Sequence, residues 1–133
     1  MICKNYVVSG EDVNDFMVME TRAYLSYTLR LLYRFLFANG FSKERLHALQ
    51  LGLQERKDIL VSYQDLMFTE PFFVEMKQCC IGDKITVESY FFNSRNECCA
   101  EVTKEVEWFD PVRSKVIAAP KHILRHFNAI NRA

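Results

Sequence analysis

The chain has 133 residues, half of them hydrophobic and 14% aromatic, with only four glycines and three prolines. This composition is typical of one folded domain with a sizeable core, and it excludes a disordered or linker-rich protein. The formal net charge of zero argues against general nucleic-acid binding.

The balanced charge is unevenly distributed along the chain. After Asp110 there are five basic residues and no acidic one, so the preceding residues carry a net charge of −5. A basic end favours a phosphate-bearing or acidic partner, although solvated surface charge explains it equally well.

The cysteines and the apolar runs indicate the cellular compartment in which the protein is expected. No apolar run is long enough for a signal peptide or a membrane span. The five cysteines include two adjacent doublets, Cys79-Cys80 and Cys98-Cys99. Neighbours in a strand point to opposite faces, so a doublet suits neither a metal site nor a disulfide. We therefore expect reduced thiols that pack as small hydrophobic residues, and a cytoplasmic location.

The first half of the chain is predicted to hold a short strand over residues 3–8, a polar loop and a long helix over residues 20–38. The polar positions of this helix recur every four residues, at Arg22, Ser26, Arg30 and Arg34. That spacing gives one narrow polar stripe, so most of the helix must be buried. Asn39 and Gly40 both tolerate the left-handed conformation that ends a helix.

The second half is predicted to be a short helix followed by antiparallel strands. Ser42 can cap the helix, over residues 43–53. The strands are expected over residues 59–68, 72–81, 84–92, 101–109 and 114–119. Pro120 can begin a last short helix, over residues 121–130. This order predicts an α+β fold in which one sheet wraps one helix, with an open sheet edge that a second copy would protect.

Side-chain patterns within these elements predict what is buried. In residues 101–109, Val102, Val106 and Trp108 share one face. The other face, which we expect to meet solvent, carries Glu101, Thr103, Glu105 and Glu107. Six aromatic residues are expected in the core or along an acyl tunnel: Tyr27, Phe35, Phe72, Phe73, Phe91 and Phe92.

Three segments resemble the hot-dog fold thioesterases of the 4-hydroxybenzoyl-CoA thioesterase and tol-pal-associated acyl-CoA thioesterase kind. The segment EDVNDFMVMETRAYLSY has the length and frame of the family's opening motif, which ends in a Tyr-Leu pair, here Tyr24-Leu25. The segment IGDKITVES resembles a strand opening of the family, and EVEWFDPVRSKVIAAP resembles its last hairpin. The resemblance covers roughly residues 4–120. It implies a single hot-dog domain over residues 1–133, with an antiparallel sheet wrapped around one long central helix.

The same resemblance implies an activity and an assembly. It implies an acyl thioester hydrolase that acts on acyl-CoA or acyl-carrier-protein thioesters without a cofactor. It also implies a homodimer or homotetramer, with active sites in grooves between protomers.

The chain departs from the family at the active-site motif. Asn14 stands at the position of the family's usual catalytic aspartate, and Phe16, Met17 and Val18 replace its glycine or Gly-His. Leu29 stands where a glutamate is often found. These changes favour the alternative of a non-catalytic hot-dog protein that binds an acyl chain or serves as a partner subunit. Thioesterases of enediyne polyketide pathways resemble this chain in the same segment and also place asparagine there, which keeps the hydrolase reading open.

The candidate catalytic residues are Asn14, Arg30, Asp12 and Asp15. Thioester hydrolysis needs a placed water, a held carbonyl group and a stabilised oxyanion. The helix start near residues 19–22 supplies free N–H groups for the oxyanion. Asn14 can donate a hydrogen bond but cannot act as a base near neutral pH, whereas Asp12 and Asp15 can. Structural roles compete in each case: a loop asparagine, turn aspartates and a surface or interface arginine.

The candidate substrate-binding residues are Met19, Glu20, Tyr24, Lys121 and Arg125. The last two belong to the basic end, which is expected near the pocket mouth, where it would attract coenzyme A phosphates or an acidic carrier protein. His122 and His126 can share a helix face as zinc ligands do. No third ligand lies near them in the sequence, so no metal is expected. A dehydratase or isomerase is disfavoured because no histidine lies in the opening motif.

Overall fold

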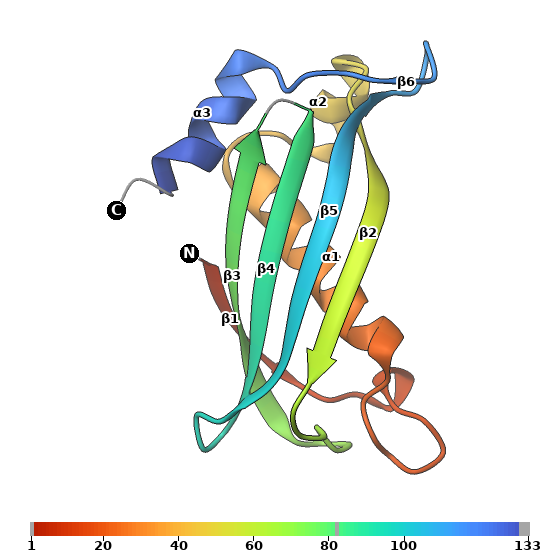
Figure 1. Ribbon diagram of the computed structural model, residues 1–133, viewed down its shortest axis with the longest axis vertical. Helices are drawn as coiled ribbons and strands as arrows, with labels where there is room; N and C mark the ends of the chain where they lie inside the picture. Colours follow the sequence, from red (N-terminus) through yellow and green to blue (C-terminus); the bar gives the residue numbers. More distant parts are fainter. Residues whose placement is uncertain (1, 82, 131–133) are drawn as a thin grey trace.

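In the computed structural model, which describes residues 2–81 and 83–130, a curled antiparallel sheet wraps around one long helix (Figure 1). The helices are α1 (Thr21–Ala38), α2 (Lys43–Ala48) and α3 (Lys121–Ile130), with a 3-10 turn at Gly10–Asp12. The strands are β1 (Ile2–Val7), β2 (Gly52–Ser62), β3 (Pro71–Ile81), β4 (Lys84–Asn93), β5 (Cys98–Asp110) and β6 (Lys115–Val116). The strand order is β1-β3-β4-β5-β2, and the short β6 pairs with β5. The α+β hot-dog prediction is confirmed.

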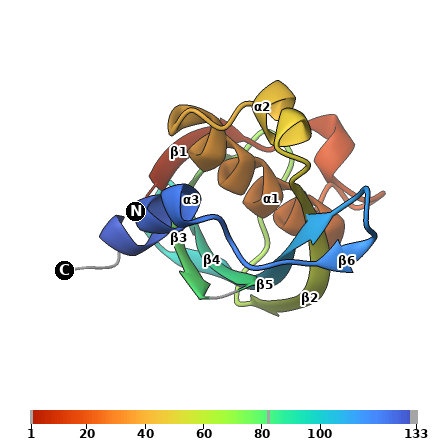
Figure 2. The same ribbon diagram turned by 90° about the horizontal axis from the view of Figure 1, so that it is seen from above.

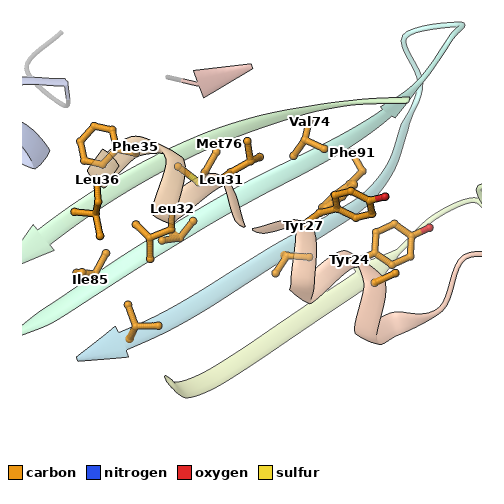
Figure 3. Close-up of a cluster of buried hydrophobic side chains, with 14 of the residues drawn as sticks. Tyr24, Tyr27, Leu31, Leu32, Phe35, Leu36, Val74, Met76, Ile85 and Phe91 are labelled. Atoms are coloured by element: carbon orange, nitrogen blue, oxygen red, sulfur yellow. The ribbon is translucent and has the colours of Figure 1, made fainter. Parts of the chain in front are cut away.

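Helix α1 is buried on all sides but one, as its sequence predicts. Its exposed stripe is made by Arg22, Ser26, Arg30 and Arg34. Figure 3 shows the opposite side, where Leu31, Leu32 and Phe35 meet side chains of the sheet. At the end of the helix, Asn39 Nδ2 donates to the Phe35 carbonyl oxygen at 2.8 Å, and Gly40 follows in the left-handed conformation with φ 87°.

Several predicted boundaries are wrong, and the largest errors surround β2. Helix α2 ends at Ala48, and the strand expected over residues 59–68 begins earlier, at Gly52, and ends at Ser62. Strand β2 is an edge strand whose side chains are mostly exposed, so its sequence lacks the alternation of a half-buried strand. Its pairing with β5 decides its extent, because Gly52 lies opposite Phe109 and Ser62 lies opposite Ala100. The last strand, expected over residues 114–119, is only Lys115–Val116.

The two faces of β5 follow the prediction with two exceptions. Val102, Val106 and Trp108 are buried as expected, but Glu107 on the other face is also buried. Arg56 of β2 forms an ion pair with the Glu107 carboxylate and covers it.

The second exception is a lysine on the inner face of β5. Lys104 is 1% exposed and lies between Val102 and Val106. Its ammonium pairs with Glu55 and with Asp58, both on β2. Burial by itself lowers the pKa of Lys104, but the hydrogen bonds with these carboxylates outweigh it, so the pKa is raised. Lys104 is therefore charged, and its ion pairs join β2 to β5.

The remaining predictions for the core hold in part. Tyr27, Phe35, Phe72 and Phe91 are buried, but Phe73 and Phe92 lie half-buried on the outer face, stacked at 4.8 Å. This outcome follows from strand alternation, since each outer ring neighbours a buried one.

The described cysteines are all free thiols, and in each doublet the second cysteine is buried while the first is only half-buried. The indole Nε1 of Trp108 donates to the sulfur of Cys80 at 3.2 Å. Burial raises the pKa of the Cys80 thiol. The doublets therefore serve packing, as predicted.

Helix α3 covers one end of the half-barrel, beside the end of α1 (Figure 2). Its Ile123 and Phe127 are fully buried, and the Phe127 ring meets Phe35 at 4.9 Å and Trp108 at 6.3 Å. The helix begins after Pro120 as predicted, and the carbonyl oxygen of that proline accepts the first helical hydrogen bonds. In the part of the chain that the structure describes, no helix combines the length and apolar character needed to cross a membrane.

Candidate active site

Residues 13–19 form a tight hairpin that the Asn14 side chain holds together. Asn14 N–H donates to the Val18 carbonyl oxygen at 2.9 Å, and Met17 N–H donates to the Asn14 carbonyl oxygen at 3.0 Å. The side-chain Oδ1 of Asn14 accepts from the N–H groups of Phe16 at 2.9 Å and Val18 at 3.2 Å. Within the described residues Asn14 Nδ2 makes no hydrogen bond, so the amide NH₂ is the group that Asn14 can offer to a ligand.

A second loop, residues 63–70, lies against this hairpin. Met19 N–H donates to the Leu66 carbonyl oxygen at 2.8 Å, and Phe68 N–H donates to the Met17 carbonyl oxygen at 2.8 Å. The two loops together leave large apolar side chains in solvent: Phe16 is 82%, Met17 51%, Met67 41% and Phe68 43% exposed. We call these four side chains the apolar rim. Such a cluster marks a surface for a ligand or another protein.

The start of α1 lies beside the hairpin and has no side-chain cap. Glu20 occupies the N-cap position, but its carboxylate pairs with Arg22 Nε at 2.5 Å instead of capping the helix. Arg22 also donates to the Glu11 carbonyl oxygen at 2.6 Å. In the described structure the backbone N–H groups of Thr21 and Arg22 therefore lack a protein acceptor, and the helix dipole adds partial positive charge there.

Asp12 is a buried anchor of the loop. Its Oδ2 accepts from Tyr27 OH at 2.6 Å and from Ser9 N–H at 3.1 Å. Burial, together with the bond to Asp12, raises the pKa of Tyr27 to about 12, so the phenol remains a donor at neutral pH. The Arg30 guanidinium lies over the Tyr27 ring, 4.8 Å from its centroid. Arg30 thus reaches the loop only through Tyr27.

Two of the predicted substrate-binding residues, Tyr24 and Met19, lie beneath the loops in the core. Both are buried, and Tyr24 meets Phe91 edge-on at 4.9 Å. Burial raises the pKa of Tyr24 to about 12, so it too stays neutral. Asp15, in contrast, is exposed next to Asn14, and Glu20 is half-buried at the start of α1, where its N–H donates to the Asp12 carbonyl oxygen at 2.8 Å. The structure therefore brings most of the predicted residues of the opening motif to one place.

Lys121 and Arg125 lie elsewhere. They belong to α3, at the far end of α1 (Figure 1), and the helix is 18 residues or about 27 Å long. One chain therefore does not bring them to Asn14. The His126 ring lies 5.8 Å from the Phe41 ring, and the side chain of His122 lies outside the described residues. Across the described ranges, no three His, Cys, Asp or Glu side chains are grouped as metal ligands.

Two parts of the site have no signal in the sequence. Residues 63–70 form half of the apolar rim, yet their apolar run is typical of a strand. Beneath Tyr24, Thr28 Oγ1 and Ser89 Oγ share a buried hydrogen bond at 2.5 Å across α1 and β4. Only the tertiary structure brings together residues 61 positions apart.

Comparisons with known proteins place the fold. No family model matches the sequence, and no curated protein matches it. Among solved structures, a 1,4-dihydroxy-2-naphthoyl-CoA thioesterase from Synechocystis has a TM-score of 0.86 at 8% identity, covering 98% of each chain. A gentisyl-coenzyme A thioesterase has a TM-score of 0.80 at 15% identity, covering 92% of this chain and 98% of its own. A Staphylococcus aureus protein solved in complex with CoA has a TM-score of 0.84 at 12% identity, covering 95% and 83%. At these identities the likeness establishes the fold alone.

Proposed function

We propose that this chain hydrolyses acyl thioesters carried on coenzyme A. The observation that carries the proposal is the uncapped start of α1 beside the Asn14 hairpin, because free N–H groups there suit a thioester oxyanion. Two proteins of the same fold with solved structures are thioesterases of CoA esters, which favours CoA over an acyl carrier protein as the carrier.

The proposed roles follow from the geometry. The N–H groups of Thr21 and Arg22 and the Nδ2 of Asn14 hold the thioester oxygen and stabilise the negative charge that forms on it. Asp15, exposed next to Asn14, takes the proton of the attacking water. Water adds to the carbonyl carbon, the carbon–sulfur bond breaks, Asp15 returns the proton to the departing sulfur, and the thiol and the free acid leave.

The other opening-motif residues have supporting roles in this proposal. Asp12 fixes the loop through Ser9 and Tyr27, and Arg30 is a positioning residue that acts through the Tyr27 ring. Tyr24 and Met19 form the apolar floor beneath the hairpin, and Glu20 orients Arg22.

We further propose that a second copy completes the site. The apolar rim leaves one side of the hairpin uncovered. Edge strand β2 continues the exposed apolar surface with Ile59 at 45% and Val61 at 43%, and Tyr63 follows at 55%. An unpaired edge with such side chains favours pairing with another chain. Contact of Lys121 or Arg125 with the carrier then depends on this assembly, and salt should weaken carrier binding if they take part.

The test is thiol release from acyl-CoA and acyl-carrier-protein substrates of varied acyl length. We expect slow turnover in the parent chain. Asn14→Asp should change the turnover rate, because the carboxylate retains both backbone hydrogen bonds of Oδ1 but replaces the Nδ2 donor with an acceptor. Loss of one oxyanion donor typically costs about 2.7–4 kcal/mol, roughly a hundred- to thousandfold in rate. Asn14→Ala is less informative, because it also removes both loop hydrogen bonds.

Asp15→Asn tests the base separately from the fold. Its side chain is exposed, so a loss of turnover without a loss of stability supports the role. Unchanged turnover in both Asn14→Asp and Asp15→Asn would remove these residues from the mechanism. A cytoplasmic location remains a prediction, to which the free thiols lend support.

A second function is favoured by one observation. Asn14 Oδ1 already accepts two backbone hydrogen bonds, so this oxygen is occupied in holding the loop. That arrangement suits a hot-dog protein that binds an acyl chain, or acts as a partner subunit, without hydrolysing anything. Binding of a non-hydrolysable acyl-CoA analogue with no thiol release from any substrate would favour this function.

A further inference from the structure

A groove of about 1140 Å³ runs along the outer face of α1, apart from the Asn14 hairpin. It exists because the sheet curls around the helix without closing, which leaves α1 and α2 between the two edge strands β1 and β2 (Figure 2). Its lining comes from these four elements, with Trp108 of β5 at its floor. The volume exceeds that of an ordinary small-molecule site.

One wall of the groove is cationic. Three cations lie around Tyr6 on this wall, namely Lys4 of β1 and the α1 residues Arg30 and Arg34. Burial raises the pKa of the Tyr6 phenol, and the charges of both arginines act against it, which places them close to this ring. Lys4 Nζ lies 5.4 Å from the Tyr6 centroid. Among the described residues none of the three cations forms an ion pair.

The remaining lining is mainly apolar. The Tyr33 and Phe37 rings lie 5.9 Å apart on α1, and Phe37 is 45% exposed. Leu51, which directly precedes β2, and Leu53 of β2 complete this part. Helix α2 adds three polar residues to the lining, namely the cation Lys43, the acid Glu44 and His47.

Glu55, a carboxylate beside the apolar part of the groove, is ion-paired with a buried lysine. Glu55 lies close enough to Tyr33 to raise the pKa of its phenol, after the larger effect of burial. Its carboxylate is ion-paired with Lys104. Among the described residues that line the groove, the carboxylate of Glu44 stands against the four cations Lys4, Arg30, Arg34 and Lys43.

We propose that this groove binds a long-chain fatty acid, with the carboxylate on Arg34, Arg30 and Lys4 and the alkyl chain along Tyr33 and Phe37. Guanidinium groups bind carboxylates with two parallel hydrogen bonds. The rise along α1 from Arg30 to Phe37 is about 10 Å, which suits an extended chain rather than a compact anion. Arg30 is shared with the proposed hydrolytic site, where it lies over the Tyr27 ring, but neither Asn14 nor the start of α1 lines the groove, so binding here does not require thioester hydrolysis.

The single tryptophan offers a direct readout. Dodecanoate, kept below its micellar concentration, is titrated into the full chain while Trp108 fluorescence and binding heat are followed. We expect saturable binding of one molecule per chain. Arg34→Gln and Lys4→Gln should each weaken binding about tenfold, through loss of a charge-assisted hydrogen bond. Decanoate should bind roughly tenfold more weakly than dodecanoate, because two fewer methylene groups are buried.

Controls keep the outcome specific. Arg95→Gln removes an exposed arginine of the β4–β5 turn and should leave binding unchanged. Dodecanol, with the same chain and no charge, should bind at least tenfold more weakly than dodecanoate. Equal binding of dodecanol, or no effect of Arg34→Gln and Lys4→Gln, overturns the proposal.

Two further results would overturn the proposal by giving the ligand another site or the groove another role. If Asn14→Asp abolishes dodecanoate binding while Arg34→Gln does not, the ligand lies at the hairpin and the proposal fails. If no dodecanoate binds and Arg34→Gln instead lowers the mass measured by sedimentation, the groove is a contact between chains. Because none of these readouts requires turnover, failure of the hydrolase proposal leaves this test intact.

Discussion

The two ends of α1 differ in how the chain completes them. At its C-terminal end, the Asn39 amide satisfies a helical carbonyl oxygen, and Phe127 of α3 packs on Phe35. At its N-terminal end, Glu20 pairs with Arg22 instead of capping, and Phe16 stands in solvent. One end of the helix is therefore closed by packing, while the other leaves backbone donors and apolar side chains uncovered.

The largest expected effect concerns the closed end. Phe127→Ala should lower the free energy of unfolding by about 3–5 kcal/mol, because it removes a fully buried ring that touches Phe35 and Trp108. Urea denaturation measures the change. Phe16→Ser, at the open end, should shift stability by no more than about 0.5 kcal/mol. Equal losses in the two variants would contradict the division of α1 into a folding end and a functional end.

The open end should instead affect assembly. Phe16→Ser combined with Met17→Ser should weaken self-association by about thirtyfold or more, as removal of large side chains from an interface centre does. Sedimentation equilibrium across a dilution series gives the dissociation constant. Val112→Ser, a matched change at a side chain 68% exposed in the β5–β6 turn, should have no effect. A chain that is monomeric at micromolar concentration removes the proposed dimer and its shared site.

A smaller effect is expected where the hairpin is tied to the helix. Tyr27→Phe should destabilise the fold by about 1–3 kcal/mol, because the buried Asp12 carboxylate loses its phenol donor. The pKa of Tyr27 is raised in the fold from 10.0 to about 12, so its contribution is complete below pH 10 and is lost as the pH rises toward 12. The free energy of unfolding, measured by urea denaturation between pH 8 and 12, should therefore depend less on pH in Tyr27→Phe than in the parent. Identical pH profiles would mean that the bond to Asp12 adds nothing.

The smallest effect is a difference in reactivity among the cysteine thiols. Their rates of labelling distinguish exposed from buried positions in the folded protein. Cys3 is exposed, whereas burial raises the pKa values of Cys80 and Cys99 and reduces their thiolate fraction at any given pH. A thiol reagent at pH 8 should modify Cys3 first and the two buried cysteines only on unfolding. Cys3→Ser identifies the fast phase, and fast labelling of Cys80 in that variant would show that the α3 end opens readily.

Elements with strong local patterns could be predicted from the sequence alone. The four-residue spacing from Arg22 to Arg34 marked the exposed stripe of α1, and the alternation of Val102, Val106 and Trp108 marked the inner face of β5. Pro120 marked the start of α3. In each case neighbouring residues carry the information, because helix and strand periodicities are local.

The other features depend on contacts between residues that are far apart in the sequence. Strand β2 has no buried face to create a pattern, so its limits came from pairing with β5. From its sequence Lys104 would be expected at the surface. It is buried because Glu55 and Asp58 of the neighbouring strand β2 neutralise its charge. The groove on α1 likewise requires a sheet that curls without closing, which brings Lys4 close to Arg34 from 30 residues away. Contacts between distant residues leave no local signal, and the candidate site and groove are built from such contacts.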